Sequence, residues 1–155
     1  MEVRMGEVLQ FWKRYEEIKV QDEDGKEITT LRINTSDAGT ATRFRNVIKK
    51  IQAKEKAFHA QANAMQGKLP ENPEIDDMMP VFDLHLQHCK DLGQDIDEMF
   101  GAGTVERMTA PNREINPDFI PDETWYADFI EMVTPVMEKL FNAHFEAVKK
   151  KYGTK

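Results

Sequence analysis

Seven positions in the middle of the chain repeat in alternating steps of four and three residues. They are Met78, Phe82, His85, Cys89, Leu92, Ile96 and Met99. Because this spacing returns to the same side of an α-helix, it predicts one long helix that packs a narrow stripe, here called the seam, against another helix. Gly101 and Gly103 then favour the end of that helix. A seam of this kind serves contact between helices, so it indicates a fold class and leaves the activity open.

The composition predicts one soluble globular domain that covers residues 1–155. Apolar residues make up 40% and charged residues 32% of the chain. No run approaches the roughly 18 apolar residues that a membrane span needs, and the first residues contain no apolar signal region. The single cysteine, Cys89, has no partner for an internal disulfide. We therefore expect a cytoplasmic protein.

Charge is distributed unevenly along the chain. The net charge of −7 disfavours binding to nucleic acid or to anionic membranes, so we expect neither as a partner. Residues 43–56 nevertheless carry six cations against Glu55 alone, and residues 71–98 carry nine acids against Lys90 alone. A basic and an acidic helix that flank one apolar seam are expected to pair with each other. The alternative is that the basic segment binds an acidic partner or nucleic acid.

The periodicity predicts a mainly α, α+β fold with an N-terminal β-hairpin followed by three principal amphipathic helices. The hairpin covers about residues 14–34, and the helices cover about residues 36–66, 75–100 and 122–151. A short helical turn is expected from Thr104 through Met108, and the prolines between 110 and 121 predict an irregular loop. The predicted core comprises Phe44, Ile48, Ile51, Phe82, Leu92, Ile96, Phe129, Val133, Leu140 and Phe141.

Two local features refine the prediction for the helices. Gly93 lowers the stability of its helix by roughly 1 kcal/mol relative to alanine, which indicates a close approach by a neighbouring helix. The apolar stripe of the first helix weakens after Ile51, where glutamines and Glu55 interrupt it. The distal part of that helix is therefore expected to project from the core.

His85, His88 and Cys89 are the best candidates for a metal site. His85 and Cys89 share one helix face, and His59 or His144 would have to complete a zinc coordination shell from another helix. Both seam positions also suit simple packing, which we favour, so we expect no metal and no cofactor. Cys89 could serve as a nucleophile with a neighbouring histidine as base, but no known catalytic motif accompanies it. We therefore expect a protein that is not an enzyme.

Methionine is frequent on the predicted apolar faces. Flexible methionine side chains fill irregular cores, and they also adapt to varied partner helices. The residues open to either interpretation, and thus the candidates for partner binding, are Met78, Met79, Met99, Met108, Met132 and Met137.

Two segments resemble a known family. Residues 36–44 (SDAGTATRF) open the first helix after a hairpin, and residues 96–104 (IDEMFGAGT) close the second. Together with a final helix near Tyr126, they are similar to small proteins encoded among the tail genes of tailed phages and prophages of Gram-positive bacteria, many of which are regarded as tail assembly chaperones. The resemblance implies a non-enzymatic protein of the host cytoplasm that binds the tape-measure protein, with tail-tube subunits as a further partner. It offers no catalytic residues, and self-association stays open, as does a more general role as a helical interaction protein of a prophage.

Overall fold

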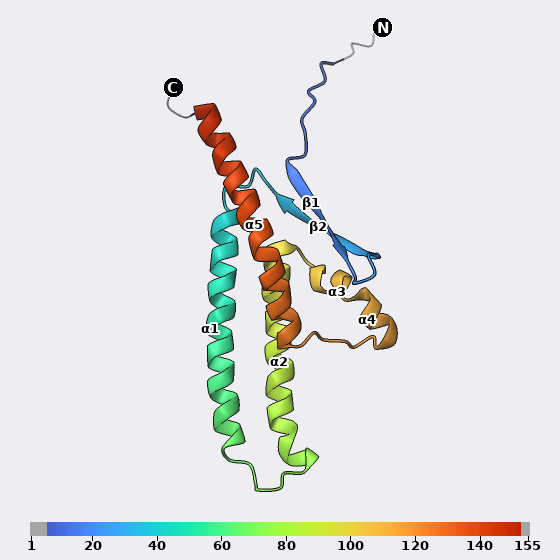
Figure 1. The fold of residues 1–155 in the computed structure, drawn as a ribbon, viewed down its shortest axis with the longest axis vertical. Coiled ribbons are helices and arrows are strands. Elements are labelled where there is room, and N and C mark those ends of the chain that lie inside the picture. The colour runs from blue at the N-terminus through green and yellow to red at the C-terminus, as the bar shows by residue number, and fades with distance from the viewer. Residues whose placement is uncertain (1–5, 153–155) are drawn as a thin grey trace.

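The computed structural model describes residues 6–152 of the chain. Its elements are β1 (Tyr15–Gln21), β2 (Glu27–Asn34), α1 (Thr40–Gln66), α2 (Ile75–Phe100), α3 (Thr104–Met108), α4 (Ala110–Ile115) and α5 (Glu123–Tyr152) (Figure 1). The structure is 64% helical and belongs to the α+β class, which confirms the predicted fold class. Within the described residues, none of the helices combines the length and the apolar character that crossing a membrane requires.

The hairpin forms where the alternating pattern predicted it. β1 and β2 are antiparallel, with Ile18 opposite Leu31. The turn is stabilised by the Asp22 side chain, whose Oδ1 accepts hydrogen bonds at 2.9 Å from the backbone N–H groups of Asp24 and Lys26. Side chains alternate between the two faces of a strand, so Leu31 and Ile33 lie on the same face, and both are buried. The inner face of β2 therefore belongs to the core.

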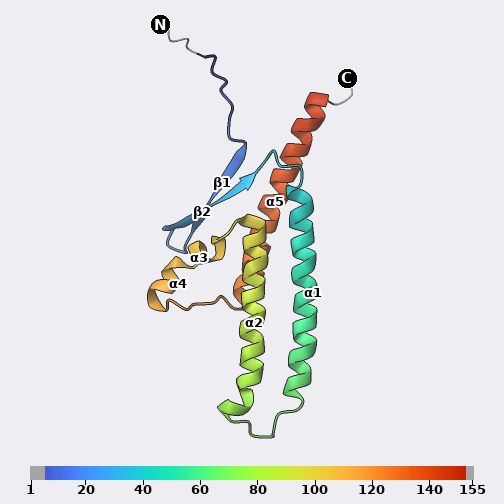
Figure 2. The same cartoon turned by 180° about the vertical axis from the view of Figure 1, so that it is seen from behind.

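Two of the three long helices, α1 and α2, form an antiparallel pair joined by the segment 67–74 (Figures 1 and 2). Lys54 Nζ lies 2.8 Å from Asp95 Oδ2, and Lys50 Nζ lies 3.3 Å from Asp95 Oδ1 and 3.2 Å from Glu98 Oε2. These ion pairs join the basic helix to the acidic one, so the predicted pairing of the two helices is confirmed. Two cations of the basic segment, Lys50 and Lys54, are therefore used in ion pairs within the fold.

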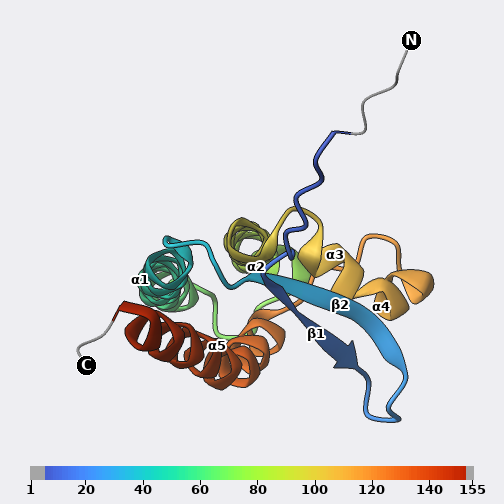
Figure 3. The same cartoon turned by 90° about the horizontal axis from the view of Figure 1, so that it is seen from above.

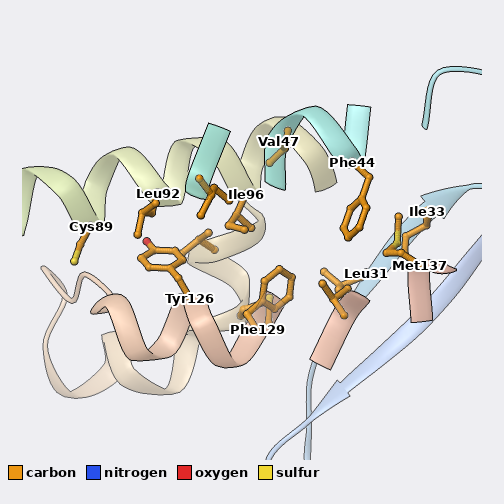
Figure 4. Packing of buried hydrophobic residues seen from close by; sticks show 14 residues of the cluster. Leu31, Ile33, Phe44, Val47, Cys89, Leu92, Ile96, Tyr126, Phe129 and Met137 are labelled. Atoms are coloured by element: carbon orange, nitrogen blue, oxygen red, sulfur yellow. The ribbon is translucent and has the colours of Figure 1, made fainter. Parts of the chain in front are cut away.

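The third long helix, α5, covers only part of the α1–α2 pair. Seen end-on in Figure 3, α1, α2 and α5 surround a common centre, and the hairpin with α3 and α4 lies beside them on the side away from α1. The core joins both layers, as Figure 4 shows for Leu31 from the hairpin, Leu92 from α2 and Phe129 from α5. α5 begins about halfway along α2 and continues past the start of α1, whereas the distal halves of α1 and α2 extend away from it (Figure 1). The expected projection of the distal first helix is therefore confirmed.

Gly93 lies at a close approach between α2 and α5. A Cβ atom placed on Gly93 would lie 2.7 Å from Oη of Tyr126, a side chain that is only 3% exposed. Such a distance is shorter than a van der Waals contact, so the tyrosine can occupy this position only because residue 93 has no side chain. The predicted close approach at Gly93 is thus confirmed.

Three predictions about the fold are wrong. The first helix begins at Thr40 and not near residue 36, because Asp37 accepts a hydrogen bond at 2.8 Å from the Gly39 N–H and holds residues 37–39 in a turn. The segment after Met108 contains the helix α4 in place of an irregular loop, since Pro111 sits in its first turn, where a missing N–H does no harm. Phe82, predicted as core, is 49% exposed because α5 does not reach it. The other predicted core residues are buried or packed against the core.

Candidate functional site

The sequence-predicted metal candidates lie on α2, but they face different neighbours. His88 is 6% exposed and points toward α1, where its Nε2 lies 2.6 Å from Oε1 of Glu55. Its ring stacks parallel on Phe58 at a centroid distance of 4.2 Å. The imidazole is therefore held on both its polar edge and its face, and it has one defined orientation.

Cys89 faces the other neighbouring helix. Its Sγ lies 3.5 Å from Nε2 of His85, and the residue is buried near the start of α5. Burial, together with the nearby carboxyls of Glu123, Asp122 and Glu55, raises the pKa of the Cys89 thiol to about 11. A thiol with this pKa stays protonated at neutral pH, so it is neither a ready nucleophile nor a ready metal ligand.

A compact group of histidines and glutamates surrounds His88, and we call it the His–Glu cluster. Its members come from α1, α2 and the first residue of α5, and they are Glu55, His59, His85, His88 and Glu123. His59 Nε2 lies 3.2 Å from Oε2 of Glu55 and 3.2 Å from Oε2 of Glu123. His85 Nε2 lies 3.5 Å from Oε1 of Glu123. Five titratable side chains from three helices thus meet at one place.

The two carboxyl groups of the cluster have opposite pKa shifts. Burial and the adjacent Glu55 carboxyl raise the pKa of Glu123. Burial alone would also raise the pKa of Glu55, but hydrogen bonding to Glu123 and to His88, with the positive potential of nearby histidines, outweighs burial and lowers it. The two carboxyls therefore titrate as a pair, with the proton favoured on Glu123.

Sequence reasoning identified some members of the cluster and missed others. His59 was named as a residue that could complete the set, and it contacts both carboxylates of the cluster, Glu55 and Glu123. His144 lies near the far end of α5 beside Phe145. Glu55 was missed, although the spacing of Glu55 and His59 by four residues on one helix could have indicated it. Glu123 could not have been assigned, because its place depends on the path of the chain between α2 and α5.

A second candidate site is an apolar stripe on the uncovered half of α2, which we call the distal patch. It comprises Ile75, Met78, Met79, Phe82 and Leu86. Phe82 is 49% exposed, and Leu86 and Met79 are exposed to a similar extent. Higher on the same helix, Cys89, Leu92 and Ile96 are buried in the core with residues of α5. The seam therefore has a covered half and an uncovered half.

The six candidate methionines divide between core and surface. Met137 and Met108 are buried in the core, and Met99 is packed against it. Met79 and Met132 are exposed, and Met78 is half-buried. Met79 and Met132 are therefore the two exposed methionines of this set, and Met78 and Met79 belong to the distal patch.

A third surface lies at the opposite end of the molecule. A groove of about 500 Å³ runs between the end of β2, the start of α1 and the last third of α5, and Ile33, Phe141, Phe145 and Val148 line it. Phe145 is 64% exposed. Within it, Phe141 of α5 packs edge-on against Phe44 of α1, with the ring centroids 5.9 Å apart.

Comparison of the chain with protein-family models, with curated proteins and with solved structures gives no match. The fold and the sites define the class as an α+β protein built on a helical pair with one uncovered face. The resemblance to tail proteins and the function of each site are therefore matters for proposal.

Proposed function

We propose that this protein is a non-enzymatic tail assembly chaperone that binds a helical segment of the tape-measure protein in the host cytoplasm. The distal patch is the observation that carries this proposal. A chaperone of this type needs an accessible apolar surface that accepts a helix, and the uncovered half of the seam has that form. Neither nucleic acid nor a membrane is proposed as a partner, and Lys50 and Lys54 are already engaged with Asp95.

The geometry of the distal patch suits a helix as its occupant. Its residues lie at helical spacing from Ile75 to Leu86, which corresponds to roughly 16 Å along the axis at 1.5 Å per residue. A partner helix of about three turns would cover it. In that position the partner would extend the contact that α5 makes with Leu92 and Ile96 higher on the same helix.

The charges around the distal patch indicate the chemistry of the partner. Acidic residues flank it and no lysine or arginine occurs between residues 71 and 89; the acids are Glu71, Glu74, Asp76, Asp77 and Asp83. A complementary helix would have an apolar stripe bordered by lysine or arginine. Such charges speed association and exclude acidic helices, whereas most of the affinity would come from the apolar contact.

The apolar area available is consistent with reversible binding. Burying the exposed half of Phe82 contributes about 1 kcal/mol, since full burial of a large apolar side chain is worth roughly 1.5–3 kcal/mol. The other patch residues contribute similar amounts, and the cost of association offsets much of the sum. A chaperone that tail-tube subunits must later displace requires moderate affinity of this kind. Met78 and Met79 also allow the patch to accept more than one helix sequence.

Co-expression with a tape-measure protein encoded in the same genome tests the proposal. The wild-type protein should raise the soluble fraction of the tape-measure protein, and Phe82→Asp should abolish this effect because it places a charge in the patch. Ile115→Asp is the matched control, since Ile115 is 87% exposed on α4 and lies outside the patch. Far-UV circular dichroism of both variants should match that of the wild type.

Three results would contradict the proposal. One is a wild-type protein that leaves the solubility of the tape-measure protein unchanged. Another is Phe82→Asp acting as well as the wild type. The third is a wild-type dimer in sedimentation that Phe82→Asp dissociates, because this would assign the distal patch to a second copy of the chain.

A further inference from the structure

We propose that the His–Glu cluster binds one divalent transition-metal ion, with Glu55, His59, His88 and Glu123 as its ligands. This set differs from the trio His85, His88 and Cys89 considered from the sequence, and it departs from our expectation that these histidines serve packing alone. Potential ligand atoms of Glu55, His88 and Glu123 all lie within 4.8 Å of one another. Among the described residues, the sequence trio does not form such a group.

Two distances within the cluster match those of a tetrahedral ion. In a zinc site with metal–ligand bonds of about 2.0–2.2 Å, neighbouring ligand atoms lie about 3.3 Å apart. His59 Nε2 lies 3.2 Å from a carboxyl oxygen of Glu55 and 3.2 Å from one of Glu123, so two edges of the tetrahedron already have the required length. His88 Nε2 lies 2.6 Å from Oε1, the other oxygen of Glu55, so the Glu55 carboxylate stands between the two histidines and would face the ion with both oxygens.

The supporting helices hold the ligands before any ion arrives. Glu55 and His59 are four residues apart on α1 and therefore share one face, so their relative position is set by the helix itself. His88 is fixed by its stacking on Phe58 and by its burial. Glu123 is the first residue of α5, so an ion would link the start of this helix to α1 and α2. Held ligands lower the entropic cost of binding.

The site also has access to solvent. The side chain of His59 is 59% exposed and that of Glu123 is 24% exposed, whereas His88 closes the inner side at 6%. An ion can therefore enter past His59 without unfolding. The donor set of two imidazoles and two carboxylates favours zinc and similar transition metals over calcium and magnesium, which bind oxygen ligands alone.

Cys89 provides a way to distinguish this site from the sequence trio. Its thiol contacts His85 and does not contact His88 in the described structure. A metal ion on Glu55, His59, His88 and Glu123 would therefore have no sulfur ligand. Cobalt(II) reports this difference, because a cobalt–thiolate bond produces a charge-transfer band that nitrogen and oxygen ligands do not.

The experiment uses the full chain, purified without a metal-affinity tag and stripped with a chelator. Isothermal titration with Zn²⁺ should show one ion per chain, and the ion should raise the melting temperature. His59→Ala should weaken binding at least tenfold and remove most of the thermal shift, without unfolding the protein, because His59 is exposed. His144→Ala is the matched control, an exposed histidine of α5 outside the cluster, and it should bind Zn²⁺ as the wild type does. Co²⁺ should give the spectrum of a four-coordinate ion with no thiolate band.

Several results would overturn the proposal. These are the absence of Zn²⁺ binding in the titration, binding that His59→Ala and Glu123→Gln both leave unchanged, and equal losses in His59→Ala and His144→Ala. A cobalt–thiolate band that disappears in Cys89→Ser would place the ion on the sequence trio instead. None of these measurements depends on a tape-measure protein. A failure of the metal proposal would therefore leave the proposed chaperone function untouched, and a failure of the chaperone function would leave the metal proposal untouched.

Discussion

Substitution of Gly93 by alanine should destabilise the protein when the hydroxyl oxygen of Tyr126 is present and stabilise it when that oxygen is removed. The new Cβ would lie 2.7 Å from Oη of Tyr126, and the next nearest atom, Cζ of the same ring, is 3.8 Å away. The first distance requires something to move, and the second is an ordinary contact. Tyr126 is buried between α2 and α5 near Leu92 (Figure 4). Its ring also packs against Trp125 at a centroid distance of 5.2 Å, so it cannot swing aside freely.

The magnitude follows from two opposing terms. Replacing glycine by alanine inside a helix stabilises it by roughly 1 kcal/mol. Forcing an extra methyl group into a packed contact destabilises by about 1–3 kcal/mol. Gly93→Ala should therefore lower the free energy of unfolding by about 1 kcal/mol in the wild type. In the Tyr126→Phe background the clashing oxygen is gone, so the same substitution should raise the free energy of unfolding by about 1 kcal/mol.

Urea unfolding followed by far-UV circular dichroism measures this for the four proteins of a double-mutant cycle. The expected coupling free energy between the two positions is about 2 kcal/mol, with unchanged dependence on urea concentration. The reasoning would be refuted if Gly93→Ala stabilised the wild type. It would also be refuted if Gly93→Ala destabilised both backgrounds equally, because the cost would then not come from Tyr126 Oη.

Two further predictions can be checked by the same unfolding measurement. Met137→Ala should destabilise the protein by about 2–5 kcal/mol because Met137 is fully buried, whereas Met132→Ala on the exposed side of α5 should stay within about 0.5 kcal/mol; equal costs would contradict the burial. Asp122 accepts hydrogen bonds from Thr124 Oγ1 at 2.6 Å and from the Trp125 N–H at 3.0 Å, which lower its pKa. Its contribution is therefore present above its unfolded pKa near 3.8 and is lost as the pH falls. Asp122→Ala should cost about 1 kcal/mol at pH 7 and progressively less on acidification, and a cost independent of pH would exclude this role.

The elements that sequence reasoning placed well are those whose signals are local. The hairpin turn depends on Asp22 and the glycine three residues later, and both lie within one short segment. The bounds of α2 follow from its repeat and from the glycines that end it. The sequence predicted that the basic helix and the acidic helix pair, though not that Lys54 contacts Asp95. Two oppositely charged helices joined by a short segment are held close together, so ion pairs between them are expected.

The candidate sites were predicted only in part, since they depend on how distant segments meet. His88 was singled out, but its partner Glu55 is 33 residues earlier, and no local pattern joins them. Glu123 reaches the cluster only because α4 and the segment after it bring the chain back to the middle of α2. That return path passes through a segment whose helix was not predicted.

The sequence by itself determined that this chain has an acidic helix with one continuous seam, because the repeat of four and three is a property of a single helix. Only the tertiary structure decided that Leu92 and Ile96 are core while Phe82 is surface. The repeat is the same in both halves of the seam, and burial depends on where the third helix starts. α5 begins at Glu123, about halfway along α2. This starting point places Glu123 in the His–Glu cluster, and it also means that α5 does not cover the distal patch.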